Sequence, residues 1–159
     1  MTAKHGDRLL EDDAVAVIKT ELLKHAYLVT PNRMEAEILS GISIASLDDA
    51  RHAARRIHDL GPAAVIVKGG HLATAADEVI DLLYDGSDFI EYVGPRVRST
   101  NTHGTGCTFG AAVTAALVLG QPLVEATRSA KTYVEQAIRH GQAIGHGYRP
   151  LEHFWNKCR

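Results

Sequence analysis

Two short, uninterrupted apolar runs constrain the fold of this chain more than any other feature. They cover residues 26–30 and 63–67. Between them the sequence carries helix signals: Ser46 suits an N-cap with acidic residues behind it, and Gly61-Pro62 ends a helix. A short run without polar alternation is typical of a strand buried on both faces. Strand, helix and strand at this spacing predict a parallel βαβ unit, and with it an α/β fold.

The remaining sequence adds a hairpin and further helices. Two β-rich runs, residues 79–84 and 89–93, are joined through Asp85-Gly86, which is a strong hairpin signal. The segment 105–119 is rich in Ala, Val and Leu and nearly free of charge, which predicts a helix buried on most sides. Pro122 suits the first turn of a last long helix. Helices are therefore expected over residues 11–25, 33–39, 47–60, 105–119 and 122–141.

Size and composition exclude several classes of protein. The 159 residues correspond to one domain, and 45% hydrophobic with 23% charged residues is enough for a packed core. A net charge of -2 provides no basic field for nucleic acid or an anionic membrane. Two cysteines form at most one bridge, so no disulfide framework follows. The first residues lack the apolar core of a signal peptide, and no apolar run approaches the ~18 residues that span a bilayer, so a cytoplasmic protein is expected.

The segment that most strongly suggests a functional site is the polar, glycine-containing loop 99–108, which runs directly into the apolar helix. Unpaired N–H groups at a helix start form an anion site, and glycines let a ligand approach the backbone. The P-loop pattern does not occur in the sequence. Cys107 falls in the first helical turn, where the thiolate is favoured. The alternatives are a helix start that binds no ligand and a cysteine that is only a small buried residue.

Polar residues also follow both predicted strands. Lys68-Gly69-Gly70-His71 comes after the second strand, where residues line the ligand crevice of open α/β sheets. A lysine neutralises phosphate, and the two glycines would admit a phosphate-sized group; the alternative is an exposed strand end. After the first strand, Asn32 and Glu35 have the spacing of a capping box, and their oxygens also suit Mg²⁺. The spacing does not decide between these two interpretations.

Taken in order, the three motifs N-x-x-E, Val-Lys-Gly-Gly-His and Asn-Thr-His-Gly-Thr-Gly-Cys-Thr closely resemble the C-terminal half of the hydroxymethylpyrimidine/phosphomethylpyrimidine kinase family of thiamine biosynthesis. Residues 1–10 and 144–151 are also similar to family segments. Related sugar and pyridoxal kinases usually carry Asp at the position of Cys107, which favours the pyrimidine branch.

The resemblance implies a fold and a domain organisation. The fold would be ribokinase-like, a three-layer α/β/α arrangement with a mostly parallel sheet and a β-hairpin edge, from which the N-terminal half is absent. Residues 1–159 would form a single domain that corresponds to the nucleotide-binding half. Because the missing half would leave an apolar sheet edge open, a homo-oligomer formed through that edge is expected.

The resemblance also implies an activity: ATP- and Mg²⁺-dependent phosphorylation of a small pyrimidine alcohol, either hydroxymethylpyrimidine or its monophosphate. Two alternatives stay open, a truncated non-catalytic nucleotide- or phosphate-binding module and a pyridoxine or pyridoxal kinase. Catalysis would fall to Cys107 as base and to Lys68 at the ATP phosphates. The implied anion hole is Gly104, Thr105, Gly106 and Cys107; the nucleotide site is Lys68, Gly70, Thr100 and Thr102; the Mg²⁺ network is Asn32 and Glu35.

Overall fold

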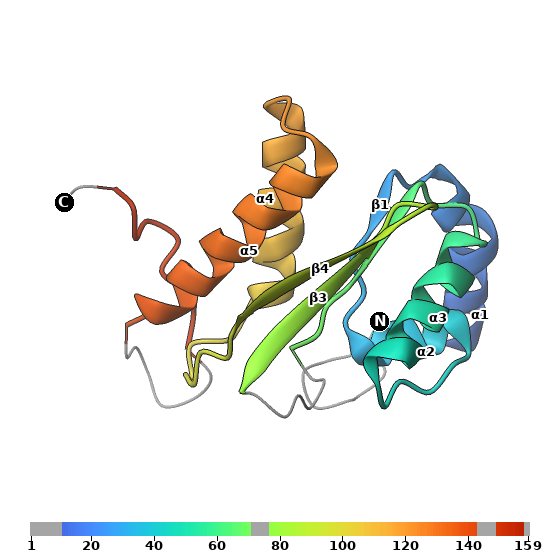
Figure 1. Ribbon diagram of the computed structural model, residues 1–159, viewed down its shortest axis with the longest axis horizontal. Coiled ribbons are helices and arrows are strands. Elements are labelled where there is room, and N and C mark those ends of the chain that lie inside the picture. The colour runs from blue at the N-terminus through green and yellow to red at the C-terminus, as the bar shows by residue number, and fades with distance from the viewer. Residues whose placement is uncertain (1–10, 71–76, 143–148, 158–159) are drawn as a thin grey trace. The chain divides into compact units, whose positions relative to one another are not determined.

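A computed structural model describes residues 11–70, 77–142 and 149–157. Its contacts divide the chain into two compact units, Met1–Arg96 and Val97–Arg159. The first unit contains the sheet and the second contains two helices and the C-terminal tail (Figure 1). The predicted α/β class is confirmed. That residues 1–159 form one domain stays a prediction.

The first unit is built on a four-stranded sheet in the order β1-β2-β3-β4. The strands are β1 (Leu28–Val29), β2 (Ala64–Val67), β3 (Glu78–Tyr84) and β4 (Phe89–Pro95). Strand β1 pairs with β2 in parallel, which confirms the predicted βαβ unit. Strands β3 and β4 pair in antiparallel register across the Asp85-Gly86 turn, which confirms the hairpin edge.

The sheet is mixed rather than mostly parallel. Of its three pairings in the described residues, only β1 with β2 is parallel, and β2 with β3 is antiparallel. A parallel connection needs a crossover of about a dozen or more residues, commonly a helix. The segment between β2 and β3 is shorter than that, so β3 returns beside β2 in the opposite direction.

Helices α2 and α3 of the first unit begin where their capping residues predict. Helix α1 (Asp12–Val17) continues through a π-helical turn η1 (Ile18–Leu22) and a 3₁₀ turn η2 (Leu23–His25), so the expected helix 11–25 is not uniformly α-helical. Helix α2 spans Arg33–Ser40 and helix α3 spans Leu47–His58. Ser46 and Asp49 form a reciprocal capping box at the start of α3. Hydrogen bonds, first from the Ser46 hydroxyl and then from backbone N–H groups, lower the pKa of Asp49.

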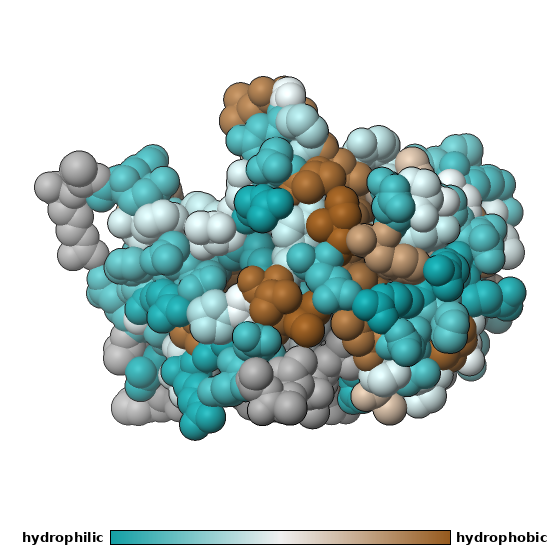
Figure 2. All heavy atoms as spheres, viewed as in Figure 1, coloured by the Kyte–Doolittle hydropathy of each residue, from teal (hydrophilic) through white to brown (hydrophobic). Residues whose placement is uncertain are grey.

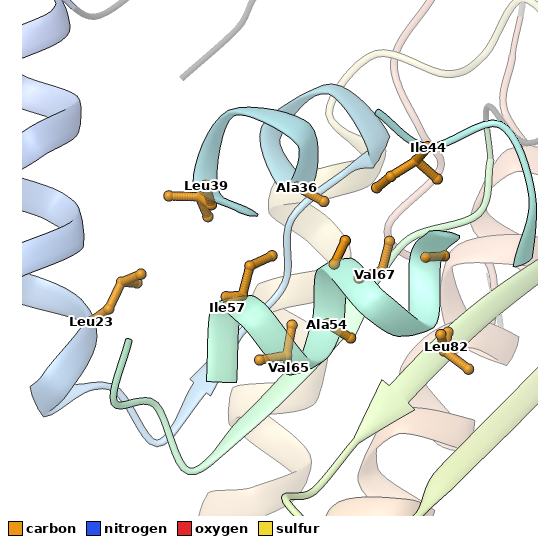
Figure 3. Close-up of a cluster of buried hydrophobic side chains, with 11 residues drawn as sticks. Leu23, Ala36, Leu39, Ile44, Ala54, Ile57, Val65, Val67 and Leu82 are labelled. Carbon is orange, nitrogen blue, oxygen red and sulfur yellow. The ribbon is translucent and has the colours of Figure 1, made fainter. Parts of the chain in front are cut away.

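A hydrophobic core joins these helices to the sheet (Figure 3). Side chains from α2 and α3 meet the apolar residues of β2 and β3. All four residues of β2 are buried, as the uninterrupted apolar run predicts. The fully or nearly fully buried cluster consists of Leu23, Ala36, Leu39, Ile44, Ala50, Ala53, Ala54, Ile57, Val65, Val67 and Leu82.

The second unit pairs α4 (Thr105–Val118) with α5 (Leu123–Arg139). Contrary to the prediction, α4 is not buried on most sides. Its buried residues form one stripe, Thr108, Phe109, Val113 and Ala116, because α5 covers one side of the helix. At the end of α4, Val118 and Leu119 are 81% and 82% exposed. Figure 2 shows hydrophobic residues at the surface where α4 ends in Figure 1. In the described ranges, no helix has both the length and the apolar character to cross a membrane.

The core of the first unit can be tested at α3. Ile57 is completely buried, so Ile57→Ala leaves a cavity, and we expect the free energy of unfolding to fall by about 2–5 kcal/mol. Val17 is 57% exposed, so Val17→Ala serves as a matched truncation with an effect within about 0.5 kcal/mol. Urea denaturation followed by circular dichroism measures both changes. Equal effects of the two substitutions would contradict this packing.

Candidate functional site

The parallel pairing of β1 with β2 places the first two sequence motifs side by side. Beyond the strand ends, Asn32 and Lys68 continue the pairing as a parallel bridge. The backbone N–H of Lys68 donates to the Pro31 carbonyl at 2.9 Å. Asn32 and Lys68 lie 36 positions apart in sequence, and together they form one polar edge at the carboxyl ends of two strands. Such edges are where open α/β sheets bind ligands.

Asn32 and Glu35 form a complete capping box at the start of α2. Asn32 Oδ1 accepts from the Glu35 backbone N–H at 3.0 Å, and Glu35 Oε2 accepts from the Asn32 backbone N–H at 2.9 Å. The capping interpretation of this motif is therefore confirmed. The Mg²⁺ interpretation stays a prediction. It would require Asn32 Oδ1 and Glu35 Oε2 to bind the cation while they keep their capping hydrogen bonds.

Lys68 is half-buried and its ammonium group is already anchored. Nζ donates to the carbonyl oxygen of Thr30 at 2.7 Å, at the end of the first apolar run. The side chain is thus held at the polar edge rather than extended along an exposed strand end.

The two glycines after Lys68 have different surroundings. Gly69 is buried, and a Cβ built there would lie 1.7 Å from the carbonyl oxygen of Ile80. Gly70 is exposed, and a Cβ there would meet no atom within 4 Å. The expectation that both glycines make room for a phosphate is therefore wrong for Gly69, whose missing side chain admits the backbone of β3 instead. His71 lies outside the described residues.

In the second unit, α4 begins at a glycine with a left-handed backbone. Gly104 is the N-cap residue with φ 85°, a conformation that favours glycine, and no side chain caps this helix. Thr105, Gly106 and Cys107 form the first turn, whose N–H groups have no intrahelical acceptor. Cys107 is exposed, so the alternative of a small buried cysteine is wrong. The geometry is that of an open helix N-terminus suited to an anion.

The loop in front of α4 is held by the C-terminal tail. The Thr100 carbonyl accepts from the Arg149 N–H at 3.1 Å and from the Thr102 N–H at 3.0 Å. The Arg149 carbonyl accepts from the His103 N–H at 3.2 Å. The Thr102 carbonyl accepts from the Thr105 hydroxyl at 3.3 Å, next to the helix start. Thr100 and Thr102 thus shape the backbone that leads into α4.

Sequence reasoning assigned no role to several residues that position these segments. Buried Asn101 donates from Nδ2 to the Gly141 carbonyl at 2.6 Å, and a Cβ on Gly141 would lie 2.7 Å from the Asn101 side chain. Asp81 and Arg96 hold the glycines after Lys68 through hydrogen bonds to Gly69 N–H and the Gly70 carbonyl. The sequence did carry one signal for such a role, namely that Asp81 is an acidic residue within the apolar run of β3.

Glycine turns at strand ends and an open helix N-terminus are typical of α/β proteins that bind phosphate groups. The chain belongs to the phosphomethylpyrimidine kinase family, whose sequence model matches residues 1–152. It is 42% identical, over 97% of its length, to the hydroxymethylpyrimidine/phosphomethylpyrimidine kinase of Bacillus subtilis. It is 48% identical, over 96% of its length, to the thiamine biosynthesis bifunctional protein ThiED of Geobacter sulfurreducens. The chain spans 56% of the former protein and 31% of the latter.

Solved kinase structures share its fold. The pyridoxal kinase of Staphylococcus aureus in complex with AMP-PCP aligns with a TM-score of 0.90 and 36% identity, covering 99% of this chain and 57% of that one. The phosphomethylpyrimidine kinase of Clostridium difficile aligns with a TM-score of 0.73 and 36% identity, covering 87% of this chain and 54% of that one. These similarities confirm the ribokinase-like fold that the motifs implied.

Substitutions at Asn32 separate its capping function from any other function. Asn32→Ala removes the oxygen that accepts from Glu35 N–H, so we expect a loss of about 0.5–2 kcal/mol in the free energy of unfolding. Asn32→Ser keeps a capping oxygen and should retain most of that stability. Chemical denaturation measures both, with Asn156→Ala at an exposed position as control. A stability of Asn32→Ala equal to that of the control would contradict the capping assignment.

Proposed function

We propose that this chain provides the nucleotide-binding half of a kinase that phosphorylates hydroxymethylpyrimidine or its monophosphate with ATP. The observation that carries the proposal is the start of α4, where left-handed Gly104 opens a helix with no side-chain cap and Cys107 is exposed in its first turn. Membership of the phosphomethylpyrimidine kinase family supports this assignment. The proposed place of the reaction is thiamine biosynthesis, as the names of the relatives indicate.

Phosphate binding is assigned to one segment in each unit. The N–H groups of Thr105, Gly106 and Cys107, following Gly104, would bind phosphoryl oxygens that carry the charge developed during transfer. Lys68 would contact the ATP phosphates through its Nζ ammonium group, which is held at the polar edge of the sheet.

Nucleotide binding is assigned to Gly70 and to the loop that contains Thr100 and Thr102. The exposed Gly70 leaves room beside Lys68 for a phosphate-sized group. Thr100 and Thr102 lie in the loop that the tail holds in place, and they would border the nucleotide. Solved kinases of this fold have been crystallised with ADP or AMP-PCP, which supports ATP as the donor.

The residues proposed for the Mg²⁺ network fit a cation that is shared with phosphate. Within the described part of the chain, no group of three or more His, Cys, Asp or Glu side chains is placed to hold a metal. Mg²⁺ commonly takes one or two carboxylates together with waters and substrate phosphates rather than a complete protein cage. Glu35, with the amide oxygen of Asn32, would supply such a partial set, and Mg²⁺ would neutralise charge on the phosphates.

Cys107 is assigned the proton transfer. In the proposed step its thiolate takes the proton of the hydroxymethyl group while the hydroxyl oxygen attacks the γ-phosphorus in line. The bond between the γ-phosphorus and the bridging oxygen breaks, and ADP leaves with the electron pair. The exposed position of the thiol at the helix start is compatible with access to a substrate.

A kinase assay with ATP, Mg²⁺ and hydroxymethylpyrimidine tests this assignment. Cys107→Ala removes the base, so we expect turnover to fall by about 100-fold or more while AMP-PCP binding is unchanged. Thr114→Ala, at an exposed position further along α4, is the matched control and should turn over like the wild type. Equal rates for Cys107→Ala and the control would contradict the base assignment. A folded wild-type chain that binds AMP-PCP but forms no product would favour the non-catalytic module.

Pyridoxal kinase is the second candidate because the structural alignment with the Staphylococcus aureus pyridoxal kinase reaches a TM-score of 0.90. We expect a higher kcat/KM for hydroxymethylpyrimidine than for pyridoxal, since the sequence relatives with 42% identity or more carry pyrimidine kinase or thiamine biosynthesis names. Parallel assays of both alcohols with the same chain measure the ratio. A higher kcat/KM for pyridoxal would assign the chain to the second class.

Self-association through the sheet edge is also proposed. Strand β1 pairs only with β2 in the described residues, and Tyr27 beside it is 59% exposed. Unpaired strand edges with apolar neighbours promote association, and lysines placed there oppose it.

We therefore expect light scattering to detect a dimer or larger assembly that Tyr27→Lys dissociates. Val118→Lys, at an exposed position of α4, is the control and should leave the assembly intact. A wild-type chain that is monomeric at all concentrations would contradict this association.

A further inference from the structure

We propose that Asp81 is a positioning residue for the nucleotide site, acting with Arg96 to set the geometry of the Lys68-Gly69-Gly70 turn. The inference rests on the proposed function, because it assigns the ATP phosphates to this turn. It adds two residues of the hairpin segment, which comprises residues 78–96, to the nucleotide site that the motifs imply. Asp81 lies in β3, and Arg96 directly follows β4.

Asp81 is an unusual residue for its position. It lies in the middle of β3 and is 7% exposed, directly before the fully buried pair Leu82 and Leu83. Burying a carboxyl group is costly unless hydrogen bonds compensate for the lost water. Oδ1 accepts from the backbone N–H of Gly69 at 2.8 Å, which supplies such a bond. The buried carboxyl thus holds the turn that follows β2.

The turn also packs directly on the backbone of β3. No side chain fits at Gly69, because its Cβ would lie 1.7 Å from the carbonyl oxygen of Ile80. Close packing against Ile80 and the hydrogen bond to Asp81 therefore act on the same residue from neighbouring positions of one strand. Together they fix the distance of Gly69 from β3 and the direction of its N–H.

Arg96 holds the next residue of the turn. Its Nη1 donates to the Gly70 carbonyl at 2.8 Å, which fixes the direction of this carbonyl. The guanidinium is itself anchored by the Glu78 carbonyl, 3.3 Å from Nη2, and by the Asp77 carboxylate, 3.7 Å from Nε. A carbonyl oxygen that turned toward a phosphate would repel it, so holding the Gly70 carbonyl protects the proposed phosphate site.

The turn is consequently held on two sides. On one side the Lys68 N–H and Nζ bond to the Pro31 and Thr30 carbonyls at the end of β1. On the other side the hairpin segment holds Gly69 and Gly70 through Asp81 and Arg96. A turn that is held before the ligand arrives loses less conformational freedom on binding, which favours affinity. The inference is that affinity for nucleotide phosphates depends on the two side chains of the hairpin segment.

Calorimetric titration of the full chain with AMP-PCP tests the inference. We expect Asp81→Ala to weaken AMP-PCP binding by about tenfold, a factor that corresponds to ~1.4 kcal/mol. Asp81→Asn keeps an oxygen that accepts from Gly69 N–H, so it should restore most of the affinity. Arg96→Gln, at a partly exposed position, should weaken binding in the same direction and provides a second variant if Asp81→Ala does not fold.

Leu82→Ala is the matched structural control. It truncates the next residue of β3, which is 1% exposed, and should lower the unfolding midpoint without changing the AMP-PCP affinity of the folded chain. Amide hydrogen exchange at Gly69 is a readout that needs no nucleotide. Faster exchange in Asp81→Ala than in Leu82→Ala would show that the hydrogen bond holds the turn.

The outcomes separate the inference from the proposed function. Weakened binding in Asp81→Ala and Arg96→Gln, recovery in Asp81→Asn and wild-type affinity in Leu82→Ala support it. Wild-type affinity in folded Asp81→Ala, or an equal loss in Leu82→Ala, overturns it and leaves the proposed function intact. A folded wild-type chain that binds no AMP-PCP overturns the proposed function and the nucleotide role of Asp81, even where Gly69 exchange confirms the hydrogen bond.

Discussion

The parallel pairing of β1 with β2 is the interaction on which the candidate site of the first unit depends. It continues past both strands as the bridge between Asn32 and Lys68, so two polar motifs that are distant in sequence become neighbours. The buried apolar run of β2 makes this pairing stable, because Val65 and Val67 pack in the same buried cluster as side chains of α2 and α3. Without the pairing, the capping box of α2 and the anchored ammonium of Lys68 would have no common edge of the sheet.

Residues of this site carry structural bonds as well as their proposed chemistry. Asn32 and Glu35 cap a helix, and Lys68 bonds to a carbonyl of the neighbouring strand. These bonds hold the side chains in place, which is the condition for binding a charged group without large ordering costs. Asp81 and Arg96 hold Gly69 and Gly70 in the same way, through hydrogen bonds to their backbone groups. Structural and functional interpretations of one motif are therefore compatible, and substitutions that keep the structural bond are needed to distinguish them.

Local signals predicted the elements of the chain well, and non-local packing explains the differences. Ser46 and Asn32 begin helices because each side chain accepts a backbone N–H of the first turn, a pattern visible in four consecutive residues. The Asp85-Gly86 turn predicts its hairpin for a similarly local reason. The burial of α4 was overestimated, since an apolar composition does not reveal how many neighbours a helix has. For Gly69, sequence alone did not distinguish space for a phosphate from space for the backbone of β3.

The sequence by itself determined the α/β class, the order of the helices and strands, the hairpin and the family to which the chain belongs. Each of these follows from periodicity, capping residues or a contiguous motif, all of which are written within short stretches of chain. Only the tertiary structure decided that β2 and β3 are antiparallel, that Cys107 is exposed, and that Asp81 and Arg96 reach the turn after Lys68. These features depend on which strands pair and in which register. Such contacts join residues that are far apart in sequence, so no local pattern of residues reveals them.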